Sequence, residues 1–152
     1  KEANNLTKDT IYMGQVLLIP TAEKNISSRA QYLTVNQEEL ELMSRIVYGE
    51  SRGEPFEGQI AVAAVILNRV FSDDFPATIS EVIYQDLAFT AVADGQYKLN
   101  PDAQAYQAVR QALSGYDPTY GALYYWNPST ATSRWVWSRE VTLKIGRHVF
   151  AR

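Results

Sequence analysis

Carboxylates and tyrosines are the side chains best placed to do acid–base chemistry in this sequence. Among its 152 residues there is no cysteine, and His148 is the single histidine. Disulfides, thiol nucleophiles and zinc sites built from several Cys or His ligands are therefore excluded. A Ser-His-Asp triad needs only one histidine, so composition leaves it open, but we expect none, because we identify no Gly-x-Ser-x-Gly stretch to support it. We expect no metal and no cofactor.

Glu50 is the carboxylate whose position is most informative. It follows Gly49, where a helical pattern over residues 37–48 stops. The unpaired carbonyls at a helix C-terminus disfavour a carboxylate and raise the pKa of a nearby acid. Burial against Tyr48 or Phe56 would act in the same direction. A carboxylic acid that stays protonated near neutral pH is the group that protonates a glycosidic oxygen.

Two arginines oppose this interpretation. Arg45 and Arg52 lie close to Glu50 in sequence, and contact with either would lower its pKa. The sequence does not decide between burial and these cations. Glu50 is thus either a catalytic acid or one solvated acid in a charged loop.

Five other acids are candidates for a second catalytic carboxylate. Glycosidases with two carboxylates hold them about 5–5.5 Å or about 6.5–9.5 Å apart. Glu57 is more simply interpreted as an acid of the first helical turn, and Glu54 as a loop acid or a contact at the edge of a cleft. Asp73, Asp74 and Asp94 fit turns.

Helices that would position Glu50 are predicted on both sides of it. Asn36 and Glu39 form a capping-box pattern before the helix at 37–48, which we expect to end at Gly49. The segment 57–70 is apolar nearly all round, which is typical of a central buried helix, with Arg69 at its exit to the surface. Residues 85–100 show no clean period and form an irregular stretch.

Further elements complete an α+β architecture, a helical body with a small antiparallel sheet towards the C-terminus. A short helix runs from Thr78 or Ser80 through Tyr84, and another begins at Asn100-Pro101-Asp102, with Asn100 as cap, and stops at Gly115. Residues 122–127 and 134–138 are predicted to pair as a hairpin, and residues 141–150 to add one or two strands broken at Gly146.

The beginning of the chain is expected to form a separate region. Residues 1–20 resemble the last part of a LysM peptidoglycan-binding module in Asn4-Asn5-Leu6, Thr10-Ile11-Tyr12, Gly14-Gln15 and Leu18-Ile19-Pro20. The first strand and helix of such a module are missing, so we expect an incomplete remnant, or else a loosely docked tail. Residues 21–35 are predicted to be a linker and residues 36–152 the catalytic domain.

Charge and hydropathy limit the kinds of partner that the chain is expected to bind. The net charge is -3, which argues against nucleic acid because such partners require a basic face. The longest apolar run is too short to span a membrane. The chain starts at Lys1 without a signal peptide, so we expect a fragment of a longer protein whose export signal lies outside it.

The core sequence resembles the SleB/CwlJ family of cell-wall hydrolases. The matching residues occur in order from about residue 38 to 150: Gly49-Glu50-Ser51-Arg52-Gly53-Glu54-Pro55, Glu57-Gly58-Gln59, Ala61-Val62-Ala63-Ala64-Val65, Val82-Ile83-Tyr84-Gln85, Ala88-Phe89-Thr90-Ala91-Val92-Ala93-Asp94-Gly95, Tyr124-Tyr125-Trp126-Asn127-Pro128 and Ile145-Gly146-Arg147-His148-Val149-Phe150.

This resemblance implies a fold related to lysozyme-like lytic transglycosylases and an enzyme of peptidoglycan degradation, notably of the spore cortex during germination. It places the single catalytic glutamate of the family on Glu50. The expected product carries a 1,6-anhydro ring on muramic acid after cleavage of the bond to N-acetylglucosamine. The resemblance also implies that the enzyme acts outside the cytoplasm, on the cell wall or the spore cortex. The founding family member carries a different binding domain, so a LysM-bearing relative is expected.

The same motifs supply candidates for substrate binding: Tyr84, Gln85, Phe89, Thr90, Tyr125 and Asn127. Gln85 and Thr90 would contact N-acetyl or hydroxyl groups, and Phe89 would line the cleft. For Tyr84 and Phe89 a place in the core is an equal alternative, and His148 fits a structural role better.

Two other functions remain open at this level. One is a muramidase that uses water, and the other is a peptidoglycan-binding protein without activity. A wall amidase is disfavoured, because most need zinc held by several His or Cys ligands. The sequence leaves undetermined whether cortex or vegetative wall is the substrate, which protein partners act and which oligomer forms.

Overall fold

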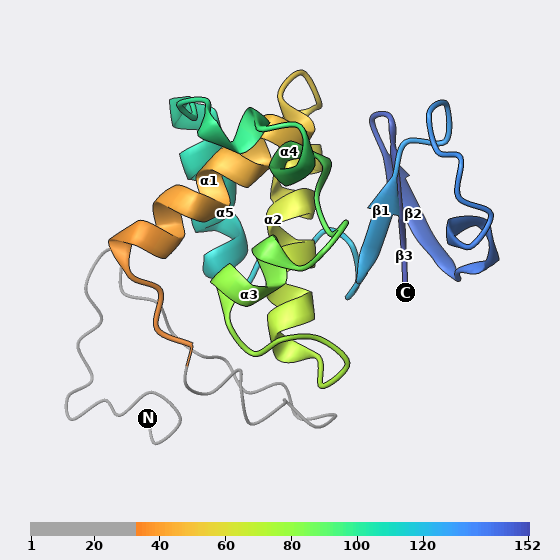
Figure 1. Ribbon diagram of the computed structural model, residues 1–152, viewed down its shortest axis with the longest axis horizontal. Coiled ribbons are helices and arrows are strands. Elements are labelled where there is room, and N and C mark those ends of the chain that lie inside the picture. Colours follow the sequence, from red (N-terminus) through yellow and green to blue (C-terminus); the bar gives the residue numbers. More distant parts are fainter. Residues whose placement is uncertain (1–32) are drawn as a thin grey trace.

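The computed structural model describes residues 33–152, which form a helical body with a small three-stranded sheet packed beside it (Figure 1). This confirms the predicted α+β class. The LysM remnant and most of the linker fall on residues 1–32, outside the described part, and stay predictions. No helix within residues 33–152 is long and apolar enough to cross a membrane.

Helix α1 (Gln37–Ser51) carries Glu50 in its last turn. The capping box is confirmed, because Asn36 Oδ1 accepts from the Glu39 amide at 2.9 Å and Glu39 reaches back to the Asn36 amide. The expected end at Gly49 is wrong. The helix continues for two residues beyond Gly49 to Ser51, with Arg52 as its C-cap, and the left-handed glycine that follows is Gly53.

Helix α2 (Phe56–Phe71) is the central helix, as predicted. It packs against α1, against the short helix α3 (Ile79–Tyr84), against α5 (Ala103–Leu113) and against the sheet. One side contributes Ile60, Val62 and Ile66 to the main core, and the other contributes Ala61 and Val65 to a second cluster with Ala122 and Phe150 beneath the sheet. Burial on both sides explains why the sequence is apolar around most of the helix.

The stretch between α3 and α5 is more ordered than its sequence indicates. It holds a one-turn helix, α4 (Thr90–Ala93), and a 3-10 turn, η3 (Gln96–Lys98), both packed on α1. Thr78 caps α3, as expected. Helix α5 begins two residues later than predicted, because Asp102 rather than Asn100 accepts the capping hydrogen bond, from the Ala105 amide at 2.8 Å.

The sheet has the order β1-β3-β2, with β1 (Tyr124–Trp126), β2 (Val141–Ile145) and β3 (His148–Ala151), all antiparallel. The turn at Gly146 joins β2 to β3, as predicted. The expected hairpin between residues 122–127 and 134–138 is wrong, because β1 pairs with β3 instead. Residues 134–138 contain the 3-10 turn η4 (Val136–Ser138).

Candidate active site

An open cleft of about 640 Å³ lies between the helical body and the sheet. Its helical wall comes from the end of α1, from Leu87, Ala88, Thr90 and Ala91, and from Gln96. Its other wall comes from β1, the segment after β1 and His148. Glu50 is the only carboxylate among the described residues that line it. The cleft therefore presents a single acid to whatever it binds.

Three separate segments meet at the Glu50 carboxyl group. Oε1 accepts a hydrogen bond from the Ala91 amide of α4 at 2.5 Å, and Oε2 accepts one from the Tyr125 hydroxyl of β1 at 2.7 Å. Both donors favour the carboxylate, as does the backbone of Thr90. Glu50 is thus held in one position by groups that are 41 and 75 residues away in sequence.

Burial raises the pKa of Glu50, and its effect exceeds that of the hydrogen bonds from Ala91 and Tyr125, which lower it. The carboxyl group of Asp94 adds to the rise. Glu50 is therefore a partly buried acid with a raised pKa that still has hydrogen-bond donors in place for its ionised form.

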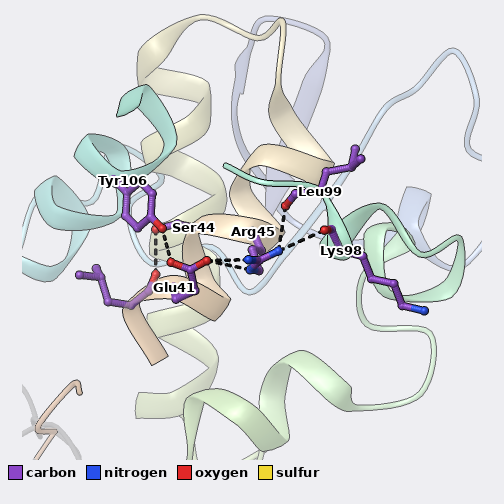
Figure 2. Close-up of polar contacts among 7 residues, drawn as sticks. Glu41, Ser44, Arg45, Lys98, Leu99 and Tyr106 are labelled. Carbon is purple, nitrogen blue, oxygen red and sulfur yellow. Dashed lines mark hydrogen bonds and ion pairs between the residues drawn. The ribbon is translucent and has the colours of Figure 1, made fainter. Parts of the chain in front are cut away.

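Neither arginine considered from the sequence forms an ion pair with Glu50 in the described part of the chain. Figure 2 shows Arg45 engaged elsewhere, with Nε 2.9 Å from Glu41 Oε1 and Nη1 donating to the Lys98 carbonyl at 3.1 Å. The hydroxyl of Tyr106 donates to the other oxygen of Glu41. Arg52 lies over the ring of Tyr48. This is why burial determines the pKa.

Gly49 lets α4 approach α1 at the level of Glu50. A Cβ atom built on Gly49 would lie 2.6 Å from the Cβ of Ala91, closer than side chains pack. The glycine expected to stop the helix instead provides space inside it. Because Ala91 donates to Glu50, this close approach sets the position of a hydrogen bond in the site.

Arg69 anchors the start of β1 and was missed from the sequence, where it was expected to reach the surface. It is buried, and its Nε donates to the Leu123 carbonyl at 2.8 Å. Its guanidinium lies 5.2 Å from the ring centroids of Phe75 and Phe89 and 5.7 Å from that of Tyr124. The cation is accommodated by aromatic faces and one carbonyl, which holds the strand bearing Tyr125 against α2.

The structure brings Thr90, Tyr125 and Asn127 to the cleft but not the other predicted binding residues. Phe89 is only 2% exposed and belongs to the main core, so its expected place in the cleft wall is wrong. Tyr84 ends α3 and Gln85 follows it; both are exposed and neither lines the cleft. Tyr84 lines a separate hollow together with residues of α1 and η3.

Trp126 and His148 also line the cleft, although the sequence did not indicate it. Alternation along a strand predicts that Tyr125 and Trp126 face opposite sides, but β1 is only three residues long and the chain turns at once. The ring of His148 lies 5.2 Å from that of Tyr125, and burial lowers the pKa of His148. Burial therefore favours the neutral form of the imidazole that packs against the ring of Tyr125.

The other acids take structural roles. Glu54 is buried in the turn between α1 and α2, where its carboxylate accepts from the Arg147 amide and from Arg147 Nε, each at 2.9 Å. Glu57 lies in the first turn of α2, as predicted, and accepts from the Tyr116 hydroxyl. Asp94 binds the backbone and side chain of Gln96. None of the three lines the cleft.

The expected absence of a Gly-x-Ser-x-Gly stretch is wrong, because the segment from Gly49 to Gly53 fits this pattern of serine hydrolases letter by letter. That pattern requires its serine on a tight turn between a strand and a helix. Ser51 instead ends a helix, is buried, and donates to the Val47 carbonyl at 2.6 Å. It is not a nucleophile.

Known proteins share this sequence and fold. The family model described as Cell Wall Hydrolase matches residues 53–151. A spore cortex-lytic enzyme of Bacillus cereus is 58% identical over 117 residues, covering 77% of this chain and 45% of the relative. The spore cortex-lytic enzyme of Bacillus subtilis is 54% identical, covering 74% of this chain and 37% of the relative. The chain thus spans less than half the length of these relatives.

Solved structures agree with this relationship. The catalytic domain of the Bacillus cereus SleB protein superposes with a TM-score of 0.75 at 57% identity, covering 78% of this chain and 93% of that one. The catalytic domain of the germination-specific lytic transglycosylase SleB from Bacillus anthracis also gives a TM-score of 0.75 at 57% identity, with 97% of its chain covered. On sequence and fold together, this chain belongs to the cell wall hydrolase family.

Proposed function

We propose that this chain is a peptidoglycan lytic transglycosylase in which Glu50 is both the acid and the base. The observation that carries the proposal is a partly buried carboxyl group with a raised pKa, which is the only carboxylate among the described residues that line the cleft. A transglycosylase needs one such group, because the nucleophile is a hydroxyl of the substrate. A glycosidase with two carboxylates needs a partner at about 5–9.5 Å.

In the first half of the reaction Glu50 acts as the acid. Oε1 faces a backbone amide, which can only donate, whereas Oε2 faces a hydroxyl, which can donate or accept. The proton therefore resides on Oε2. It passes to the oxygen that links N-acetylmuramic acid to N-acetylglucosamine, the bond from that oxygen to the anomeric carbon breaks, and positive charge develops on the muramic ring.

In the second half Glu50 acts as the base. Its carboxylate, now stabilised by the amide of Ala91 and the hydroxyl of Tyr125, removes the proton from the 6-hydroxyl of the muramic residue. The freed oxygen bonds to the anomeric carbon and closes the 1,6-anhydro ring. Glu50 regains its proton and no water is consumed.

Tyr125 is proposed to position Glu50 and to stabilise its ionised form. Burial and the neighbouring Glu50 raise the pKa of Tyr125 well above its ordinary value, so the hydroxyl stays protonated and remains available as a donor. Thr90 and Asn127 lie in the cleft wall and are proposed to contact the polar groups of the glycan.

The substrate is proposed to be the spore cortex or cell wall, outside the cytoplasm. Support comes from relatives whose names state that they lyse the cortex, at 54–58% identity. Identity to the cell wall hydrolase CwlJ of Bacillus subtilis is lower, 30% over 96 residues. The names of the relatives with the higher identity are what favours a cortex substrate.

Mass spectrometry of cortex and vegetative peptidoglycan after digestion tests the proposal. We expect anhydro-muropeptides from the wild type and none from Glu50→Gln, with folding unchanged by circular dichroism. Glu57→Gln is the matched control, since Glu57 is an exposed glutamate outside the cleft, and it should digest normally. Products with only reducing ends would identify a water-using muramidase instead. Glycan binding without products, in wild type and Glu50→Gln alike, would identify a binding protein.

A further inference from the structure

Leu87 lines the cleft with a backbone conformation that is unfavourable for a leucine. Its φ is +59°, in the left-handed region that residues with a Cβ atom rarely adopt. Its side chain is 97% exposed. An exposed leucine gains nothing from burial in the fold. Neither its backbone nor its side chain therefore contributes to the stability of the folded chain.

The turn that holds Leu87 would suit glycine better. The Ala88 amide donates to the Gln85 carbonyl at 3.0 Å, which closes a four-residue turn with Leu87 in third place. A left-handed residue in third place is typical of the turn class that favours glycine or asparagine there. Strain retained at a cleft points to a role in function rather than in folding.

The position of Leu87 indicates what that role is. Leu87 and Ala88 line the Glu50 cleft from the helical side, and Ala131 and Val136 line it from the segment after β1. Apolar groups thus occur on both walls above the acid. A ligand with methyl groups between polar groups would cover the leucine and gain the free energy of removing it from water.

We propose that Leu87 is a substrate-binding residue that packs against the methyl groups of the N-acetylated glycan, either acetamido or lactyl. The proposal rests on the proposed function, because it takes the peptidoglycan glycan as the ligand. It extends that function by naming a residue that selects for the substituents of the sugar.

Binding to a variant that cannot cleave isolates this contact from catalysis. In a Glu50→Gln background, the affinity for soluble peptidoglycan glycan fragments is measured by titration calorimetry, with and without Leu87→Gly. We expect the glycine to weaken binding roughly three- to tenfold, as covering about half of a leucine side chain implies. Leu87→Met, which keeps the apolar volume, should restore most of the affinity.

Tyr120 provides a matched control, because it has φ +57° and is 70% exposed but does not line the cleft. Tyr120→Gly relieves the same kind of strain and should leave binding unchanged. Thermal unfolding should show no loss of stability for Leu87→Gly, since glycine accepts the left-handed backbone. Weakened binding without lost stability is a result that a purely structural role would not produce.

Oligosaccharides of N-acetylglucosamine, which carry acetamido but no lactyl groups, separate the two sources of methyl groups. A glycine penalty on these oligosaccharides assigns the contact to acetamido, and a penalty only on muramic fragments assigns it to lactyl. Unchanged affinity in Leu87→Gly, an equal loss in Tyr120→Gly, or no glycan binding by Glu50→Gln overturns the proposal. Absence of cleavage by the wild type, with the Leu87 effect intact, would overturn only the proposed function.

Discussion

Removing the hydroxyl of Tyr125 should change both the rate and the pH dependence of cleavage. In Tyr125→Phe the ring and its packing stay, while Glu50 Oε2 loses a donor at 2.7 Å. A hydrogen bond to a charged group contributes about 1.5–3 kcal/mol. As Glu50 gives up its proton in the transition state, the loss slows the acid step by roughly 10- to 150-fold.

The direction of the pH effect follows from the same bond. The Tyr125 hydroxyl stabilises the carboxylate and so lowers the pKa of Glu50. Without it the pKa rises further, and the protonated acid persists to higher pH. The alkaline limb of the rate profile, where activity falls as Glu50 ionises, should therefore shift upward in Tyr125→Phe while the plateau falls.

Initial rates of anhydro-muropeptide release from purified peptidoglycan, measured between pH 4 and 9, provide the assay. Tyr124→Phe is the matched control, because it removes a hydroxyl from the same strand but from a residue outside the cleft lining. It should match the wild type. A Tyr125→Phe rate within about threefold of the wild type, or a slower rate whose alkaline limb does not move, would refute the assigned role.

Three further perturbations follow from the described contacts. Glu50→Gln should raise the melting temperature by a few °C, since about 1 kcal/mol of stability corresponds to roughly 2–4 °C. The gain should grow as pH rises through the raised pKa of Glu50, because only the ionised form opposes folding. A pH-independent gain in calorimetry would contradict this. Gly49→Ala should destabilise by about 1–3 kcal/mol in urea unfolding and reduce activity, because its Cβ meets Ala91, and Ala91→Gly should restore both. Glu54→Ala should cost about 2–3 kcal/mol by leaving the partly buried Arg147 amide unpaired, whereas Arg147→Ala should cost below about 1 kcal/mol, because its side chain is 68% exposed and the substitution keeps the backbone amide. Equal losses would contradict this assignment.

Local signals in the sequence predicted most of the helices. The capping box at Asn36 and Glu39 depends on residues three apart, and the apolar segment of α2 is visible within one window, so both are confirmed. The predicted end of α1 was wrong, because a glycine at the end of a helical pattern usually stops the helix and Gly49 does not. Its role here comes from Ala91, a residue 42 positions away whose approach no local pattern reveals.

The site was less accessible to prediction than the fold. Glu50 could be named from its motif, but its burial and its bond to Tyr125 depend on how the sheet packs against the helices. Residues 134–138 were predicted to pair with β1 because apolar and polar side chains alternate along them. Such alternation does not reveal which strand is the partner, and β1 pairs with β3 instead. Arg69 was predicted to lie at the surface because charged side chains are usually exposed. The aromatic rings that surround it come from distant parts of the chain, and the sequence does not show that they meet there.

The edge position of β1 links the chemistry to the last residues of the described fold. Among the strands of residues 33–152, β1 has β3 as its only neighbour, and β3 ends at Ala151. During synthesis, Glu50 and Ala91 emerge first and can assemble within the helical body, but the strand that bears Tyr125 gains its partner in the sheet only after the final strand is complete. We therefore expect the site to be completed last, and loss of pairing within residues 148–151 to disturb the hydrogen bond from Tyr125 to Glu50 more than it disturbs the helices.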